Sequence, residues 1–250
     1  MPMPPPRQPS PAARLAARTL LLVAALLVAP LPARPAPPAA PAAPAAPGAT
    51  NALPFEKEIL AYEAADRTNP PPRGAVLFIG SSSIRLWKSL PADFPRHTVI
   101  NRGFGGSQIA DSVRYTPRLI LPHRPRLVVL YAGGNDINAG KSPEQVAADY
   151  RAFVQGVHTA LPETRIAFIS IAPNPARWKQ VDRVRAANAL IEAHTRTDPR
   201  LRWIDVFPHM LGPDGLPKPD IFVQDRLHMN TNGYRLWAGV VAPYLEPASK

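Results

Sequence analysis

After residue 50 the chain contains five short hydrophobic runs, separated by segments with helical periodicity. The runs cover residues 75–79, 98–100, 127–131, 166–171 and 201–206. They are nearly continuous in hydrophobicity, which is typical of strands buried on both faces of a sheet. The pattern therefore predicts five parallel strands.

The segments between these runs have the pattern of amphipathic helices. Within residues 142–161 the apolar residues form one stripe, and Ser142 and Gln145 are spaced as a capping box. A second helix is predicted over residues 177–196, and a last helix after Asn232. Strands that alternate with helices predict a three-layer α/β/α fold around a doubly wound, parallel five-stranded sheet with right-handed crossovers.

The first 50 residues have a different composition from the rest and contain no acidic residue. Arg7, Arg14 and Arg18 precede the apolar run 19–33, which ends in small residues. A basic start followed by an apolar run and small residues is the layout of a secretory signal. We therefore expect residues 1–33 to be a signal peptide; an uncleaved membrane anchor is the alternative, although the run is short for a membrane-spanning helix.

Residues 34–50 are rich in alanine and proline, a composition that favours an extended polyproline-like tether. Residues 51–250 are then expected to form the folded domain. This organisation predicts a protein that is secreted or periplasmic, or tethered to a membrane if the signal is not removed.

Composition narrows the classes of chemistry that are open to the chain. It has no cysteine, which excludes a disulfide or a thiol nucleophile, and its formal net charge is +11. The basic residues are scattered and no nucleic-acid-binding motif accompanies them, so we expect no nucleic-acid partner. A preference for anionic cell-envelope surfaces is one interpretation of the charge. The sequence makes no prediction of oligomeric state.

Polar clusters follow the first three predicted strands, and a fourth precedes the last predicted helix. The clusters are residues 80–83, 101–108, 131–138 and 224–234. In a doubly wound sheet, ligands bind beyond the carboxyl ends of the strands, so these clusters are expected to meet. They therefore mark the candidate site.

The clusters contain the residue types that acyl transfer requires. The first holds three consecutive serines, which by themselves could form only a turn, and it lacks the Gly-x-Ser-x-Gly elbow of α/β-hydrolases. The glycines of 101–108 could form a turn or expose a backbone N–H, and Asn135 could cap a turn or donate to an oxyanion. In the last cluster, Asp225 is three residues from His228, a spacing that lets a carboxylate orient an imidazole.

In order and spacing these blocks resemble the SGNH hydrolases, also called GDSL esterases and lipases, over residues 72–245. The resemblance implies the flavodoxin-like fold of that family. It also implies that the family's Gly-Asp-Ser block falls on residues 80–82, with Ser82 as nucleophile. Ser81 then stands where the family has an aspartate that braces the loop, and Ser83 where it has an apolar residue.

The remaining blocks imply the other site residues. Asp225 and His228 match the family's Asp-x-x-His and would complete a catalytic triad with Ser82. The backbone N–H groups of Ser82 and Gly106 and the side chain of Asn135 would form the oxyanion hole. No cofactor and no metal are expected.

The resemblance predicts an esterase that acts on a small-molecule, glycan or lipid ester, with short acyl or acetyl esters, including those of carbohydrates, as the first choice. A lysophospholipase or thioesterase of the same family is the alternative. A glycan-binding protein that retains the fold without catalysis is another, motivated by Ser81, and a flavodoxin-like nucleotide binder is a weaker one. Trp87, Trp178 and Met229 are candidates for lining the substrate cleft, and Arg85 and Arg102 for meeting an anionic substrate.

Overall fold

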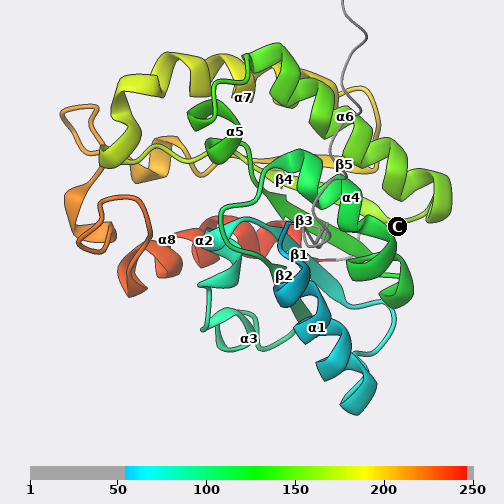
Figure 1. Cartoon of the computed structure of the whole chain (residues 1–250). Helices are drawn as coiled ribbons and strands as arrows, with labels where there is room; N and C mark the ends of the chain where they lie inside the picture. Colours follow the sequence, from blue (N-terminus) through cyan, green and yellow to red (C-terminus); the bar gives the residue numbers. More distant parts are fainter. Residues whose placement is uncertain (1–53, 247–250) are drawn as a thin grey trace, which may run out of the picture. The chain divides into compact units, whose positions relative to one another are not determined.

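The computed structural model describes residues 54–246, and within them five parallel strands form a single sheet (Figure 1). The strands are β1 (Val76–Gly80), β2 (Val99–Gly103), β3 (Leu127–Tyr131), β4 (Arg165–Ile169) and β5 (Leu201–Ile204). Their order in the sheet is β2-β1-β3-β4-β5, and every neighbouring pair is parallel. This is the doubly wound order of flavodoxin-like proteins, so the predicted fold class is confirmed.

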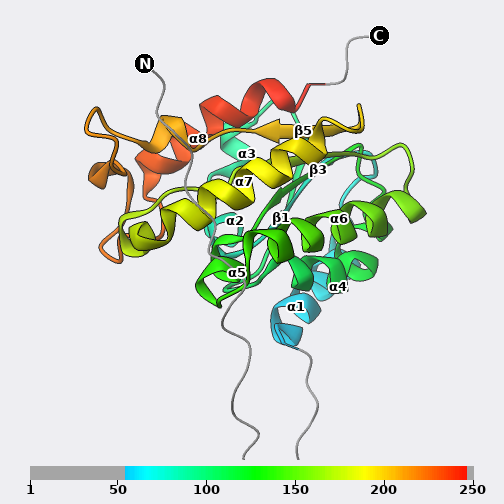
Figure 2. The same ribbon diagram turned by 90° about the horizontal axis from the view of Figure 1, so that it is seen from above.

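Helices cover both faces of the sheet. The α-helices are α1 (Glu56–Thr68), α2 (Ser82–Arg85), α3 (Leu90–Asp93), α4 (Ile109–Leu119), α5 (Gly134–Asn138), α6 (Pro143–Ala160), α7 (Val181–Thr195) and α8 (Thr231–Val241). Short 3₁₀ helices are η1 (Leu121–His123), η2 (Pro175–Gln180), η3 (Pro208–Met210), η4 (Pro219–Ile221) and η5 (Ala242–Tyr244). α1, α4, α6 and α7 lie on one face, and α2, α3 and α8 lie on the other (Figure 2).

The central strands supply both layers of the core. In β1, Leu77 and Ile79 join the cluster under α4 and α6, whereas Val76 and Phe78 join the cluster under α2 and α8. Every residue of β1 and of β3 is buried. This double burial explains why the strands appear in the sequence as continuous apolar runs rather than alternating ones.

Helix starts follow local capping chemistry. The capping box of Ser142 and Gln145 is present at the start of α6, as predicted. The last helix begins at Thr231 rather than after Asn232, because the side chain of Asn230 accepts hydrogen bonds from the N–H groups of Asn232 and Gly233. The helix predicted over residues 177–196 is a 3₁₀ segment followed by α7.

The described residues contain no helix that is both long and apolar enough to span a bilayer. The predicted signal peptide (1–33) and linker (34–50) lie outside the described residues.

Candidate active site

The first serine cluster turns sharply at the end of β1. Gly80 has φ 137°, and a Cβ there would lie 1.9 Å from the carbonyl oxygen of Tyr131. A glycine is required at this position by both backbone conformation and space. The turn buries Ser81, whose N–H donates to the Tyr131 carbonyl at 3.0 Å, and makes Ser82 the first residue of α2.

Ser82 is hydrogen-bonded to His228, which is in turn hydrogen-bonded to Asp225. Its Oγ lies 2.8 Å from Nε2 of His228, and Nδ1 of the same ring lies 2.6 Å from Oδ2 of Asp225. Ser82 and His228 are 146 positions apart in the sequence. The structure therefore brings together the three residues that the sequence singled out.

A tight turn allows Asp225 to reach His228. Arg226 adopts a left-handed conformation, with φ 57°, and its carbonyl accepts the N–H of Ala176 at 3.1 Å. Oδ1 of Asp225 accepts the backbone N–H groups of Leu227 and His228, each at 2.9 Å. Partial burial alone would raise the pKa of Asp225, but these backbone bonds and the His228 ring outweigh it and hold the pKa at about 2. The carboxylate is therefore ionised at neutral pH.

Asn135 lies at the start of α5, directly after β3. Its Nδ2 donates to the carbonyl oxygen of Ser107 at 3.0 Å, and its Oδ1 accepts from Nη1 of Arg177 at 3.0 Å. An amide nitrogen carries two N–H groups, so one remains for another acceptor. Ser107 and Arg177 therefore hold the Asn135 side chain, and one of its N–H groups has no acceptor among residues 54–246.

Gly106 lies next to Ser107 in the loop after β2, and its φ of 78° favours glycine. No described residue accepts a hydrogen bond from the N–H of Gly106 or from that of Ser82. Ser82, Asn135 and His228 line one cleft, whereas Gly106 is not among the residues that line it.

The residue after Asn135 ties two of these loops together. Asp136 is fully buried, and its carboxylate accepts the N–H of Ile109 at 3.3 and 3.2 Å and a hydrogen bond from Nζ of Lys141 at 3.0 Å. Burial raises the pKa of Asp136, although Lys141 and the Ile109 N–H oppose the shift. Asp136 therefore links the loop that contains Gly106 to the loop that contains Asn135.

A cleft opens in front of Ser82. It is lined by Ser81, Ser82, Ser83, Tyr131, Gly134, Asn135, Ala172, Pro173, Asn174, Arg177, Met210, Phe222, Leu227, His228, Met229 and Trp237. The lining includes no acidic side chain. A smaller cavity adjoins it and shares Gly134, Asn174 and Arg177 with it.

The structure separates the other candidates that the sequence suggested. Met229 lines the cleft and Trp178 lines the adjoining cavity, but Trp87 is buried in the core. Arg102 is also buried, and its Nη2 is 2.5 Å from Asp66, so it does not reach the cleft. Arg85 is not among the lining residues either and lies 3.7 Å from Glu58.

Arg177 lines the cleft and contacts Asn135, although the sequence did not single it out. It was placed only as the first residue of a predicted helix. The available signal was a polar segment, residues 173–180, directly after the fourth strand and hence at the same edge of the sheet.

Between residues 54 and 246, no three histidine, aspartate or glutamate side chains gather in a way that could hold a metal ion. The chemistry that the site itself offers is a hydroxyl beside an imidazole, a carboxylate on the far side of that ring, and nearby N–H donors. This is the set of groups that an acyl hydrolase requires.

Comparison with known proteins agrees with that class. The GDSL-like Lipase/Acylhydrolase family matches residues 78–236, and this chain belongs to that family. It is an ester-bond hydrolase.

Individual relatives resemble the chain over most of their length. The human platelet-activating factor acetylhydrolase IB subunit alpha1 is 32% identical over 201 residues, which cover 69% of this chain and 82% of the relative. A GDSL-like lipase from Bacteroides thetaiotaomicron superposes with a TM-score of 0.65 at 18% identity, covering 76% of this chain and 98% of its own. An acetyl xylan esterase superposes with a TM-score of 0.58 at 18% identity, covering 68% of this chain and 99% of its own. At such identities the two solved structures show a shared fold.

Proposed function

We propose that the chain hydrolyses short-chain carboxylic esters by transferring the acyl group to Ser82 and then to water. One observation carries the proposal: the continuous hydrogen-bonded chain from Ser82 through His228 to the ionised carboxylate of Asp225. A serine hydroxyl is a weak nucleophile until a neighbouring base accepts its proton. The imidazole is within reach of that proton.

In the first half-reaction, Oγ of Ser82 attacks the ester carbonyl while Nε2 of His228 takes the hydroxyl proton. Asp225 accepts a hydrogen bond from Nδ1 and stabilises the imidazolium that forms. The tetrahedral intermediate collapses, His228 returns the proton to the leaving alkoxide, and an alcohol departs.

The negative oxygen of the intermediate needs donors placed before it forms. The free N–H of the Asn135 side chain and the backbone N–H groups of Ser82 and Gly106 are assigned to this role. Asn135 and Ser82 both line the cleft, and the two backbone groups have no acceptor among residues 54–246.

In the second half-reaction, His228 takes a proton from a water molecule that attacks the acyl-enzyme. The second tetrahedral intermediate uses the same donors, and its collapse releases the carboxylic acid and returns the proton to Ser82.

The floor of the cleft favours a small acyl group. Tyr131 and Trp237 both line it, and their rings pack edge to face with centroids 4.6 Å apart. Trp237 is completely buried in the core, so we expect these packed rings to limit how far an acyl chain can extend. The name of the human relative, an acetylhydrolase, supports acetyl as the acyl group.

We assign the alcohol side of the substrate to a carbohydrate carrier, as the expected export of the protein favours an envelope or extracellular glycan. A lysophospholipid or a thioester is the competing substrate. Export itself rests on the basic and apolar pattern of residues 1–33. N-terminal sequencing of the protein recovered outside the cytoplasm tests it: a start after residue 33 supports cleavage, whereas an intact leader in the cytoplasmic fraction contradicts it.

The enzymatic proposal is tested on the purified protein with p-nitrophenyl acetate, butyrate, octanoate and palmitate, together with acetylated xylan, a lysophospholipid and an acyl thioester. We expect kcat/KM to fall steadily as the acyl chain lengthens. A fluorophosphonate probe should modify Ser82, as located by mass spectrometry of the labelled peptide. A protein that binds acetylated xylan but neither hydrolyses an ester nor reacts with the probe would instead be a glycan-binding relative.

A further inference from the structure

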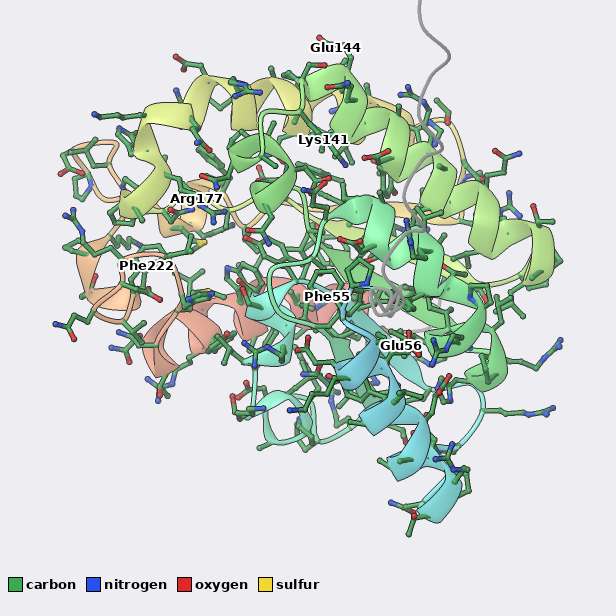
Figure 3. The ribbon with its side chains drawn as sticks, in the orientation of Figure 1. Phe55, Glu56, Lys141, Glu144, Arg177 and Phe222 are labelled. Carbon is green, nitrogen blue, oxygen red and sulfur yellow. The ribbon has the colours of Figure 1, made fainter. Side chains whose placement is uncertain are left out.

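Arg177 holds the side chain of Asn135 from the side opposite Ser107. Its Nη1 donates to Oδ1 of Asn135 at 3.0 Å and to the carbonyl oxygen of Gly134 at 3.1 Å. The guanidinium is half-buried in the wall of the cleft, on the same side of the molecule as Phe222 (Figure 3). One nitrogen therefore holds both the backbone and the side chain at the start of α5.

Hydrogen bonds also hold the backbone of the segment that contains Arg177. The backbone N–H of Arg177 donates to Oδ1 of Asn174 at 2.9 Å. One residue earlier, the N–H of Ala176 donates to the carbonyl of Arg226, which lies in the turn between Asp225 and His228. Residues 174–177 therefore connect the loop of Asn135 to the loop of His228.

These contacts determine which way the carboxamide of Asn135 faces. A guanidinium can only donate hydrogen bonds and a carbonyl oxygen can only accept them. Arg177 must therefore meet the amide oxygen, and Ser107 must meet the amide nitrogen, so both neighbours select the same orientation. In the reversed orientation the amide oxygen would meet the Ser107 carbonyl and the amide nitrogen would meet Arg177.

The positive charge of Arg177 further stabilises this orientation of the Asn135 carboxamide. Hydrogen bonds from a charged donor are about twice as strong as neutral ones. No acidic residue lines the cleft to neutralise Arg177, and no ion pair within residues 54–246 includes it. A cation on the amide oxygen also polarises the amide, which makes its N–H groups better donors.

We propose that Arg177 is a positioning residue that orients the Asn135 carboxamide so that its free N–H faces the oxyanion. The proposal rests on the assignment of Asn135 to the oxyanion hole. Arg177 acts through Asn135, and its removal lowers the rate of the chemical step more than it weakens binding of the substrate.

The test compares Arg177→Met with a matched control, Arg183→Met. Arg183 also donates to two backbone carbonyls of this region, those of Gly140 and Lys141, but it neither contacts Asn135 nor lines the cleft. With p-nitrophenyl acetate we expect Arg177→Met to lower kcat about tenfold or more with KM changed by less than about threefold. Arg183→Met should stay within about twofold of the unaltered protein. Arg177→Lys, which keeps one charged donor, should recover part of the loss.

A double-mutant cycle separates action through Asn135 from any other role. Asn135→Ala should lower kcat on the order of a hundredfold. Adding Arg177→Met to Asn135→Ala should cost less than about threefold more, because the group that Arg177 positions is already gone. An equal loss from Arg177→Met in both backgrounds overturns the proposal and indicates that Arg177 contacts the substrate directly or supports the fold alone.

A measurement that does not depend on activity keeps this proposal distinct from the proposed function. The side-chain NH₂ signals of Asn135 in a ¹H–¹⁵N spectrum are identified by their absence in Asn135→Ala. They should shift or broaden in Arg177→Met and stay unchanged in Arg183→Met. Unchanged signals in Arg177→Met overturn the positioning role. A protein that is inactive towards all esters and towards the fluorophosphonate probe refutes the proposed function. The spectra alone then decide whether Arg177 positions Asn135.

Discussion

Three consecutive serines differ in their surroundings although they are identical in chemistry. Ser81 is buried behind the turn at Gly80, and its backbone N–H is bonded to the sheet. The carbonyl of Ser83 accepts the hydroxyl of Tyr234 at 2.9 Å. The side chain of Ser82 is bonded to His228. The environment of each serine, rather than its residue type, therefore determines which is the candidate nucleophile.

A serine scan tests that distinction. Ser82→Ala should lose more than about a thousandfold in kcat/KM towards p-nitrophenyl acetate, because within residues 54–246 no other hydroxyl is hydrogen-bonded to the His228 imidazole. Ser83→Ala should retain measurable activity, and its thermal midpoint should match that of the unaltered protein. If Ser83→Ala is the inactive variant and Ser82→Ala is not, the nucleophile has been assigned one residue too early.

The low pKa of Asp225 links stability to pH. Its pKa is about 2 in the folded protein, against about 3.9 for an unperturbed aspartate. The Asp225 carboxyl group therefore binds a proton more readily in the unfolded chain than in the folded protein. Ionised Asp225 stabilises the fold fully above about pH 5, and this stabilisation is lost as the pH falls from about 4 towards 2.

Urea unfolding at pH 7 and pH 3 measures this contribution against Asp225→Asn, which keeps an oxygen for the N–H groups of Leu227 and His228. The free energy of unfolding of the unaltered protein should fall further between the two pH values than that of the variant. The other carboxyl groups titrate in both proteins, so equal falls would show that Asp225 has an ordinary pKa.

At the level of elements, the site depends on how strands end. Each parallel strand delivers its next few residues to the same edge of the sheet, and the turn that follows determines which residue faces the cleft. β1 can pass beside Tyr131 only because Gly80 has no side chain. Substituting it should therefore disturb the packing of β1 against β3 as well as the position of Ser82.

Gly80→Ala is expected to destabilise the fold by about 3 kcal/mol or more, or to prevent folding, because the added Cβ overlaps a backbone oxygen and the residue must keep a positive φ. The matched control is Gly156→Ala within α6, where an added Cβ meets no atom within 4 Å. That change should stabilise the protein by about 0.5–1 kcal/mol, since alanine is the better helix former. Urea unfolding monitored by circular dichroism measures both; similar effects at the two glycines would contradict the role of Gly80.

At the scale of the described fold, the loop that carries Asp225 and His228 is anchored in the core at both of its ends. The segment between η4 and α8 is held by the bridge between Phe222 and Met229, and both residues are buried in the same cluster as Trp237 and the strands. Ser82 and His228 come from opposite ends of this domain and meet only when the sheet and α8 are both in place.

Esterase activity and helical circular dichroism should therefore disappear at the same urea concentration, as expected of a single cooperative unit. Assays of p-nitrophenyl acetate hydrolysis along the titration, after equilibration at each concentration, provide the comparison. Activity lost well before the dichroism signal would mean that the segment around His228 opens on its own.

The sequence by itself determined the fold class, and it predicted Ser82, Asp225 and His228, which the structure joins by hydrogen bonds. Buried parallel strands are apolar throughout, and capping residues such as Ser142 act on their nearest neighbours, so both leave local patterns. The resemblance to known hydrolases aligned Ser82, Asn135, Asp225 and His228 by order and spacing alone. α8 begins at Thr231, before the predicted start after Asn232, because Asn230 caps it.

Only the tertiary structure decided which groups contact one another. Arg177, which bonds to Asn135, and Asp136, which ties together the loops of Gly106 and Asn135, depend on partners more than 25 positions away. Arg102 could have faced a substrate on sequence grounds, yet it is buried against Asp66. Contacts between distant segments depend on how the strands are ordered and the loops are packed, and no local pattern of residues encodes that geometry.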